Sequence, residues 1–153
     1  FDSDEHDEYG HITESAKVRE IMHDKRLRKM TYLKEELQEP LFVVDENADT
    51  LLVTWGSLSS PVREAVRLLN KDCNKKYAAL LFGDVWPLPD KLLIEKEKNI
   101  KELISVEQNA TGQFASLIKE CTGIVCDNSI LKYDGRPLSA QEIIAKVKGG
   151  ESM

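Results

Sequence analysis

Short apolar runs alternate with amphipathic helical segments over residues 40–149, and this alternation constrains the fold most strongly. Apolar runs of five to seven residues, the length of buried strands, recur at 41–45, 51–56, 78–82, 100–106 and 129–133. Segments with the period of helices lie between most of them, which is typical of α/β proteins with a mostly parallel sheet. We therefore predict an α/β fold with five strands.

The ends of several elements can also be located. Only a polar, turn-forming stretch separates 41–45 from 51–56, which allows these two strands to pair as antiparallel neighbours. Ser139 and Glu142 form a capping box for a last helix that ends at Gly149. A helix that opens near residue 111 should bury four side chains on one face: Phe114, Leu117, Ile118 and Cys121.

The first 39 residues have a different character. Residues 1–11 are acidic and lack apolar periodicity, so we expect an extended arm, followed by a helix from Thr13 as N-cap to about Leu37. Its apolar stripe is thin and interrupted, so this helix needs a partner to pack against. We predict an arm and linker helix over 1–39 and an α/β domain over 40–150. Because the chain starts at Phe1, we expect a fragment of a longer polypeptide.

Composition excludes several classes of partner. The net charge of −6 argues against nucleic acid and against anionic membrane surfaces. There is neither an apolar run long enough to span a bilayer nor a signal peptide, so we expect a cytoplasmic location. The three cysteines are an odd number with no C-x-x-C spacing, which argues against disulfides and against an iron-sulfur cluster in this chain.

Two stretches contain possible metal ligands. In the arm, His6 and His11 lie among Asp4, Glu5, Asp7 and Glu8, and all six are possible ligands. Their spacing matches no strong motif, and acidic arms are more often solvated or held on a partner surface. The segment 83–85, Gly-Asp-Val, resembles the start of a Gly-Asp-Gly motif that holds magnesium and diphosphate, but it lacks the second glycine. We expect an ordinary loop after a strand there.

The turn from Glu107 to Gln113 is the strongest candidate for a ligand or partner. A buried strand ends there, and Asn109, Thr111 and Gly112 lead into a helix. A helix N-terminus with unpaired N–H groups at the carboxyl edge of a parallel sheet binds anions. The equally supported alternative is that Thr111 caps the helix and that Glu107 and Gln113 form local hydrogen bonds.

Side chains for catalysis are sparse. All three histidines lie within the first 23 residues, outside the predicted α/β domain, and the predicted strand ends offer only Asp84 and Glu107 as acids or bases. We therefore assign no catalytic, cofactor-binding or metal-binding residue to this chain, and an independent enzyme is the least supported class.

Three stretches, taken in order, carry a resemblance to a known family: residues 3–14 with the basic helix 25–29, residues 53–66 and residues 106–119. They resemble the C-terminal part of the alpha subunit of 2-oxoacid:ferredoxin oxidoreductases, particularly of the 2-oxoglutarate type. The resemblance covers nearly the whole chain, through residues 133–144.

This resemblance implies a domain like the C-terminal domain of transketolase, a three-layer α/β/α sandwich whose five-stranded sheet has one antiparallel edge strand. The family oxidatively decarboxylates a 2-oxoacid to an acyl-coenzyme A and passes electrons to ferredoxin. Its thiamine diphosphate, magnesium and iron-sulfur clusters are expected outside this chain, in the rest of the alpha subunit and in a beta and sometimes a gamma subunit. The isolated domain should be inactive.

Two functions from different classes follow. An assembly domain would use the arm and the loop 107–113 as contacts with neighbouring domains and would expose an aromatic patch that includes Trp55 or Trp86. A stand-alone phosphate- or nucleotide-binding module would instead have a closed pocket at the carboxyl ends of its strands.

Overall fold

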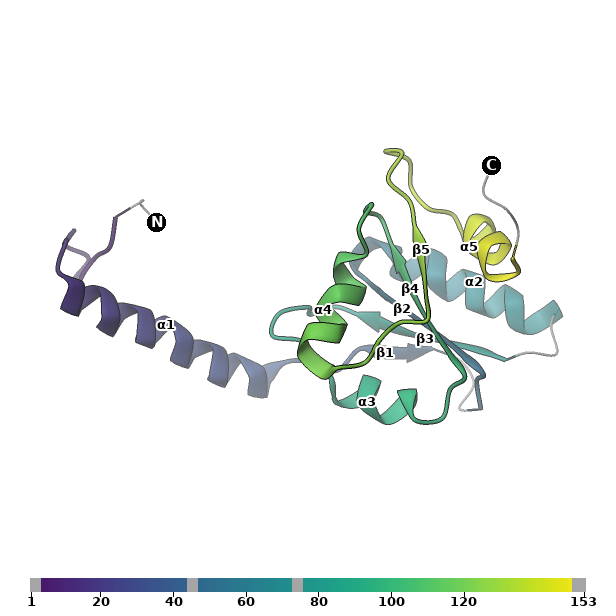
Figure 1. Cartoon of the computed structure of the whole chain (residues 1–153), viewed down its shortest axis with the longest axis horizontal. Helices are drawn as coiled ribbons and strands as arrows, with labels where there is room; N and C mark the ends of the chain where they lie inside the picture. Colours follow the sequence, from purple (N-terminus) through teal and green to yellow (C-terminus); the bar gives the residue numbers. More distant parts are fainter. Residues whose placement is uncertain (1–3, 44–46, 73–75, 150–153) are drawn as a thin grey trace. The chain divides into compact units, whose positions relative to one another are not determined.

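The computed structural model describes residues 4–43, 47–72 and 76–149, and the chain divides into two compact units (Figure 1). The first unit spans Phe1–Leu37 and the second Gln38–Met153. Of the predicted features, residues 44–46 and Cys73 lie outside the described residues.

The first unit consists of the arm and helix α1, Ala16–Glu36. The helix starts two residues later than predicted from Thr13, because Ser15 is the N-cap and its side chain accepts the N–H of Val18. The backbone N–H of Thr13 bonds to the carbonyl of Glu5 at 2.9 Å instead, which ties Thr13 to the arm.

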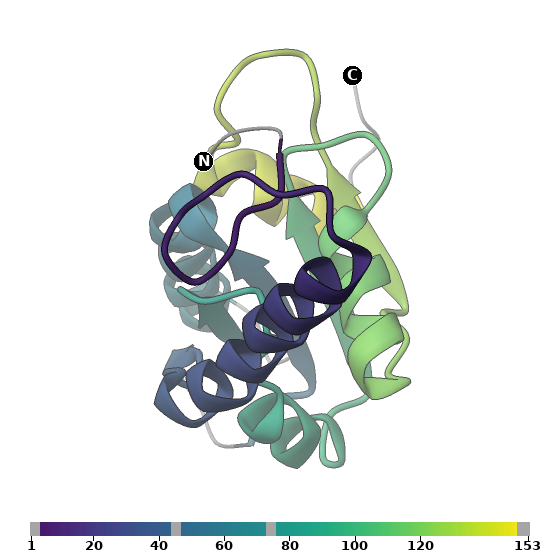
Figure 2. The same ribbon diagram turned by 90° about the vertical axis from the view of Figure 1, so that its left-hand side faces the viewer.

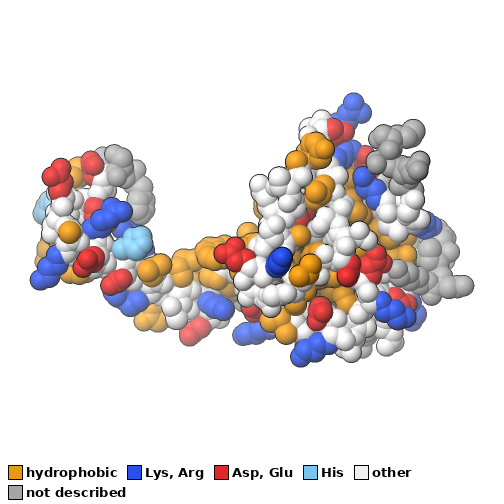
Figure 3. Space-filling view, viewed as in Figure 1, with side chains coloured by type: hydrophobic (Ala, Val, Ile, Leu, Met, Phe, Trp, Pro, Cys, Tyr) orange, Lys and Arg blue, Asp and Glu red, His pale blue; other side chains and the backbone are white. Residues whose placement is uncertain are grey.

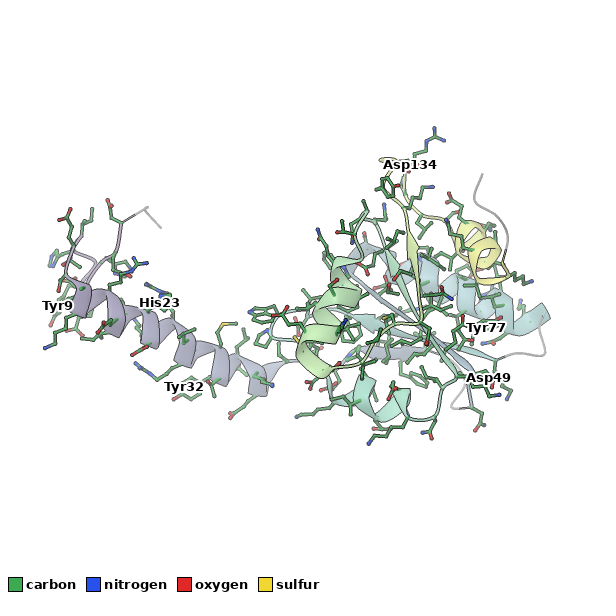
Figure 4. The ribbon with its side chains drawn as sticks, viewed as in Figure 1. Tyr9, His23, Tyr32, Asp49, Tyr77 and Asp134 are labelled. Atoms are coloured by element: carbon green, nitrogen blue, oxygen red, sulfur yellow. The ribbon has the colours of Figure 1, made fainter. Side chains whose placement is uncertain are left out.

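Several apolar side chains of α1 remain exposed: Ile21, Leu27, Tyr32 and Leu33. Figure 3 shows hydrophobic side chains at the surface along this helix, and Tyr32 projects outward in Figure 4. Met22 is its buried residue. In the part of the chain that the structure describes, no helix combines the length and apolar character that a membrane span requires.

The second unit, which we call the α/β unit, is built on a five-stranded sheet in the order β1-β3-β2-β4-β5. Strands β2 to β5 are parallel, and β1 runs antiparallel to β3 at one edge. The predicted mostly parallel sheet with one antiparallel edge strand is therefore confirmed. The strands are β1 Leu41–Val43, β2 Thr50–Trp55, β3 Tyr77–Phe82, β4 Glu102–Glu107 and β5 Asn128–Leu131.

The predicted pairing of the first two strands is wrong. Strand β1 pairs with β3, where Leu41 lies opposite Leu81, and β2 lies between β3 and β4. The physical reason is burial, since residues Thr50 to Thr54 of β2 are all fully buried and a strand buried on both faces needs a neighbour on each side. Leu41 is exposed, as an edge strand allows.

Two helices cover each face of the sheet, which gives the predicted three layers (Figure 1). Helices α2 (Ser59–Asp72) and α5 (Ala140–Val147) pack on one face, and α3 (Lys91–Glu97) and α4 (Gln113–Thr122) pack on the other. A short 3-10 helix, Gly56–Leu58, precedes α2. Side chains alternate between the two cores, so that Leu52 faces α2 while Leu51 and Val53 face α3 and α4.

The capping box predicted for the last helix and the buried face predicted for the helix before it can be compared with the structure. The capping box between Ser139 and Glu142 is confirmed at the start of α5. Phe114 and Ile118 of α4 are buried as predicted, but Cys121 is exposed. Because α4 runs back along the sheet, its last turn reaches the amino edge of the strands, where the core ends.

Candidate functional site

The loop that follows β4 is organised around one buried carboxylate, that of Glu107. Glu107, which we expected in the turn after the strand, is the last residue of β4 and is fully buried. Its Oε2 accepts the N–H of Phe114 at 2.8 Å and the side-chain amide of Asn109 at 2.7 Å, and its Oε1 accepts the N–H of Ala115 at 3.0 Å. Three donors therefore stabilise this carboxylate, which explains why it can be buried.

Asn109 completes the turn. Its Oδ1 accepts the backbone N–H groups of Thr111, Gly112 and Gln113 at 3.0, 2.8 and 3.3 Å. Gly112 has a φ of 65°, a left-handed conformation that a side chain would disfavour. The turn is thus held by local hydrogen bonds, with Asn109 rather than Thr111 as the acceptor.

These bonds decide between the two interpretations of this loop. The first N–H groups of α4 donate to Asn109 and Glu107, and the N–H of Ser116 donates to the carbonyl of Gly112. The positive end of the helix is already neutralised by the chain's own carboxylate. A phosphate at this helix N-terminus would have to displace Glu107, so the phosphate-binding interpretation is not favoured.

The outer side of the same loop remains accessible. Gln108, Thr111 and Gln113 are exposed, whereas Asn109 is half-buried and Gly112 is buried. A crevice of about 270 Å³ lies between this loop and the residues that end and follow β2. Its lining residues are Trp55, Ser57, Leu58, Gln108, Asn109 and Gln113.

The arm of the first unit is folded against α1 by a salt bridge. Glu5 is bonded to both terminal nitrogens of Arg26, at 3.2 and 2.5 Å. The Arg26 guanidinium, together with the N–H of His6, lowers the pKa of Glu5 to about 2. Arg26 lies in the basic run 25–29 of α1.

A tight turn follows in the arm. Asp7 accepts the N–H groups of Tyr9 and His11, both at 2.9 Å, and its second carboxylate oxygen lies 3.3 Å from the His11 ring. These bonds lower the pKa of Asp7. His6 pairs with Ile12 in an isolated antiparallel bridge, and its ring bonds to the carbonyl of Asp7 at 2.7 Å.

Three of the predicted arm residues, Glu5, His6 and His11, make contacts within the first unit. Asp4 is exposed, Glu5 binds Arg26, and His6 and His11 contact Asp7. Within residues 4–43, 47–72 and 76–149, no three His, Cys, Asp or Glu side chains are grouped as a metal site requires. Asp84 accepts the N–H of Gln38 at 3.3 Å, in keeping with an ordinary loop after a strand.

Sequence alone did not indicate two features of these sites. Ser57 lines the crevice beside the loop 107–113. The pairing of Glu5 with Arg26 has no local signal in the sequence, because 21 positions separate the two residues.

The cysteines that the structure describes differ in environment. Burial raises the pKa of Cys126 to about 11, and the nearby carboxylates of Glu107 and Asp127 add to this effect. A thiol with so high a pKa is a poor metal ligand and a poor nucleophile at neutral pH.

Curated relatives match nearly the whole chain. It is 37% identical over 148 residues to the alpha subunit of 2-oxoacid:ferredoxin oxidoreductase 2 from Aeropyrum pernix, covering 94% of this chain and 23% of the relative. It is also 37% identical over 152 residues to a 2-oxoacid:ferredoxin oxidoreductase alpha subunit from Saccharolobus solfataricus, covering 97% and 24%. The chain thus spans about a quarter of the length of these relatives. No protein-family model matches it.

Solved structures agree with this relationship. The 2-oxoglutarate:ferredoxin oxidoreductase from Magnetococcus marinus matches with a TM-score of 0.77 and 29% identity, over 95% of this chain and 25% of that one. The alpha chain of a probable 2-oxoacid ferredoxin oxidoreductase from Thermoplasma acidophilum is 31% identical over 72% of this chain and 95% of its own, with a TM-score of 0.50. A split-gene transketolase, with a TM-score of 0.57 over 74% of this chain and 42% of its own, is 16% identical and shows the fold alone.

Proposed function

We propose that this chain is the C-terminal assembly domain of an alpha subunit of a 2-oxoacid:ferredoxin oxidoreductase. It matches about a quarter of the length of such subunits. The observation that carries the proposal is the match at 37% identity across almost the whole chain to subunits of this kind. The match with the Magnetococcus enzyme, whose structure has 2-oxoglutarate, coenzyme A and succinyl-CoA bound, supports the 2-oxoglutarate type.

The complete enzyme would oxidatively decarboxylate a 2-oxoacid to an acyl-coenzyme A in the cytoplasm and pass the electrons to ferredoxin. Its partners would be the rest of the alpha subunit, a beta subunit and, in some complexes, a gamma subunit. This chain would contribute neither a catalytic residue nor a ligand-binding residue to the reaction.

The residues of this chain do not fit the cofactors of that reaction. Asp84 accepts a backbone N–H, and the segment 83–85 lacks the second glycine of the motif that holds magnesium and diphosphate. Cys126 has a raised pKa, which disfavours the thiolate that an iron-sulfur cluster needs. We therefore propose that thiamine diphosphate, magnesium and the iron-sulfur clusters bind elsewhere in the complex.

In this proposal the arm and the loop 107–113 form contacts with neighbouring domains. The loop supports it because its internal hydrogen bonds leave Gln108, Thr111 and Gln113 pointing outward on a rigid turn. The arm supports it because Tyr9 and Ile12 are exposed on a turn that Asp7 and Glu5 hold in place. Rigid exposed loops lose little conformational entropy on association.

Reconstitution tests the proposal. The chain would be mixed with the remaining part of the alpha subunit and the beta subunit, and complex formation followed by size-exclusion chromatography. We expect the chain to co-elute and to be required for reduction of ferredoxin by 2-oxoglutarate and coenzyme A. Pyruvate in place of 2-oxoglutarate would test the substrate type.

Alanine replacements at Gln108, Thr111 and Gln113, combined with replacements at Tyr9 and Ile12, should weaken co-elution. Replacement of exposed Lys91 on α3 is the matched control and should leave it unchanged. Assembly that tolerates all the loop and arm replacements would exclude both segments as contacts.

A further inference from the structure

Three exposed aromatic side chains lie at one edge of the sheet. Trp55 ends β2, Trp86 lies in the loop after β3, and Tyr133 lies in the loop after β5. Because these strands are parallel, the loops after them meet at the carboxyl edge, where Figure 2 shows the loops after β4 and β5 extending beyond the strands. Asp134, beside Tyr133, is at the tip of its loop in Figure 4. We call Trp55, Trp86 and Tyr133 the aromatic rim.

The degree of exposure of the rim is high for aromatic residues. Trp55, Trp86 and Tyr133 are 46%, 61% and 73% exposed. Trp and Tyr are enriched at interfaces because each covers a large apolar area and keeps a polar group for a hydrogen bond. Leu41, which is also exposed, lies at the same edge, since antiparallel β1 begins there opposite Leu81.

The crevice of about 270 Å³ lies within this edge, next to Trp55. All of its lining side chains are uncharged, in a chain in which 31% of residues are charged. Among the residues that the structure describes, the side chains of Ser57 and Gln113 make no hydrogen bond to another protein group. The crevice therefore offers an exposed indole and neutral donors and acceptors, with no charge to attract an ion.

We propose that the carboxyl edge is a docking surface for a neighbouring domain of the oxidoreductase, which covers the aromatic rim and places an uncharged segment at the crevice beside Trp55. An apolar side chain of that segment covers Trp55, and its backbone N–H and C=O groups bond to Ser57 and Gln113. The neutral lining favours such a segment over a charged one, since a charge placed there would lose its hydration without an opposite charge in return. This inference rests on the proposed function, which supplies the neighbouring domains.

Hydroxyl-radical footprinting of the reconstituted complex tests the proposal. Trp55 and Trp86 are the two tryptophans of the chain, and mass spectrometry of its peptides reads them and Tyr133 separately from partner residues. We expect oxidation of all three to fall when the complex forms. Exposed Cys121, in the last turn of α4 at the amino edge, should keep its rate and serves as the internal control.

The outcomes separate this inference from the proposed function. If the complex forms while the rim is oxidised as fast as in the isolated chain, the docking surface is wrong and the proposed function stands. If no complex forms, the proposed function fails and the docking surface fails with it. If oxidation of the rim in the isolated chain falls as the concentration of the chain rises, a second copy of this chain covers the rim and the proposal is overturned.

Substitutions give a second readout. Trp86→Ser and Tyr133→Ser should each weaken association at least about tenfold, as loss of a central aromatic contact does. Val125→Ser is the matched control, because Val125 is 60% exposed, like Trp86, but precedes β5 at the opposite edge. Circular dichroism of each variant shows whether the fold is retained. Equal affinities for the rim variants and the control would exclude the rim from the interface.

Discussion

At the scale of single residues, Glu107 joins two elements through one side chain. It ends β4, and its carboxylate accepts N–H groups from the first turn of α4 and the amide of Asn109. Glu107→Gln replaces one acceptor oxygen with a donor and leaves at least one buried N–H unpaired. We expect the free energy of unfolding to fall by about 1–3 kcal/mol, measured by urea denaturation.

The control for this prediction is Glu64→Gln. Glu64 also accepts two hydrogen bonds, from Arg67, but both side chains are largely exposed. Exposed pairs contribute little, so the unfolding midpoint should stay unchanged. Equal effects at the two positions would show that the buried network of Glu107 has no special weight.

The cysteines allow a second prediction at this scale. Cys126 has a pKa of about 11, because burial disfavours its thiolate and Glu107 and Asp127 repel it. The thiolate is the reactive form, so iodoacetamide should modify Cys126 more slowly than exposed Cys121 at pH 8. Peptide mass spectrometry should show the rate at Cys126 rising as the pH approaches 11. Similar rates at the two positions at pH 8 would contradict the buried environment.

At the scale of elements, the start of α5 combines a capping box with an ion pair. Glu142 accepts bonds from Ser139 and from the Lys132 ammonium, and that ammonium is the largest cause that lowers the Glu142 pKa from 4.5 to about 2. A carboxylate whose pKa is lower in the folded state contributes stability above about pH 4.5, and this contribution is lost as the pH falls toward 2.

Glu142→Gln keeps an acceptor for the capping box but loses the charge. We expect the variant to be less stable than the wild type at pH 7, and the difference to shrink between pH 4.5 and 2. Thermal unfolding over this pH range measures both curves. A difference that does not depend on pH would assign the role of Glu142 to hydrogen bonding alone.

Signals between residues close in sequence predicted most helices and strands. The errors concern contacts between residues far apart in sequence. The capping box at Ser139 and the strand at 78–82 depend on neighbours in sequence and were predicted correctly. The partner of β1 was not, because a short polar turn permits a hairpin and cannot show that β2 is buried on both faces. Cys121 has the spacing of a core residue, but spacing cannot show where the sheet ends.

For the candidate site too, the local features were predicted from the sequence and the long-range ones were not. The loop 107–113 was located from the pattern of a strand, polar residues and a helix, and its local hydrogen bonds were one of two open alternatives. The burial of Glu107 was missed, since a Glu at a strand end is usually exposed and its donors became evident only in three dimensions. The crevice beside Trp55 depends on the adjacency of β2 and β4, which sequence order does not show.

At the scale of the whole molecule, the two units differ in how they are stabilised. Both hydrophobic cores lie entirely within Gln38–Met153, on the two faces of one sheet. The first unit has one long helix with exposed apolar residues and the salt bridge between Glu5 and Arg26. Hydrophobic burial is the main source of stability, so the α/β unit should fold without the first unit.

A truncated chain that begins at Gln38 tests this difference. We expect cooperative urea unfolding with the same midpoint as the full chain, because removal of residues 1–37 leaves both cores intact. A peptide of residues 1–37 should be only partly helical by circular dichroism, since helices of this length depend mostly on tertiary packing. Glu5→Gln should lower the helicity of this peptide further by weakening the bond to Arg26 of α1. Glu20→Gln, also on α1, is the control and should leave the helicity unchanged. A truncated α/β unit that unfolds without cooperativity would show that the first unit is part of its core.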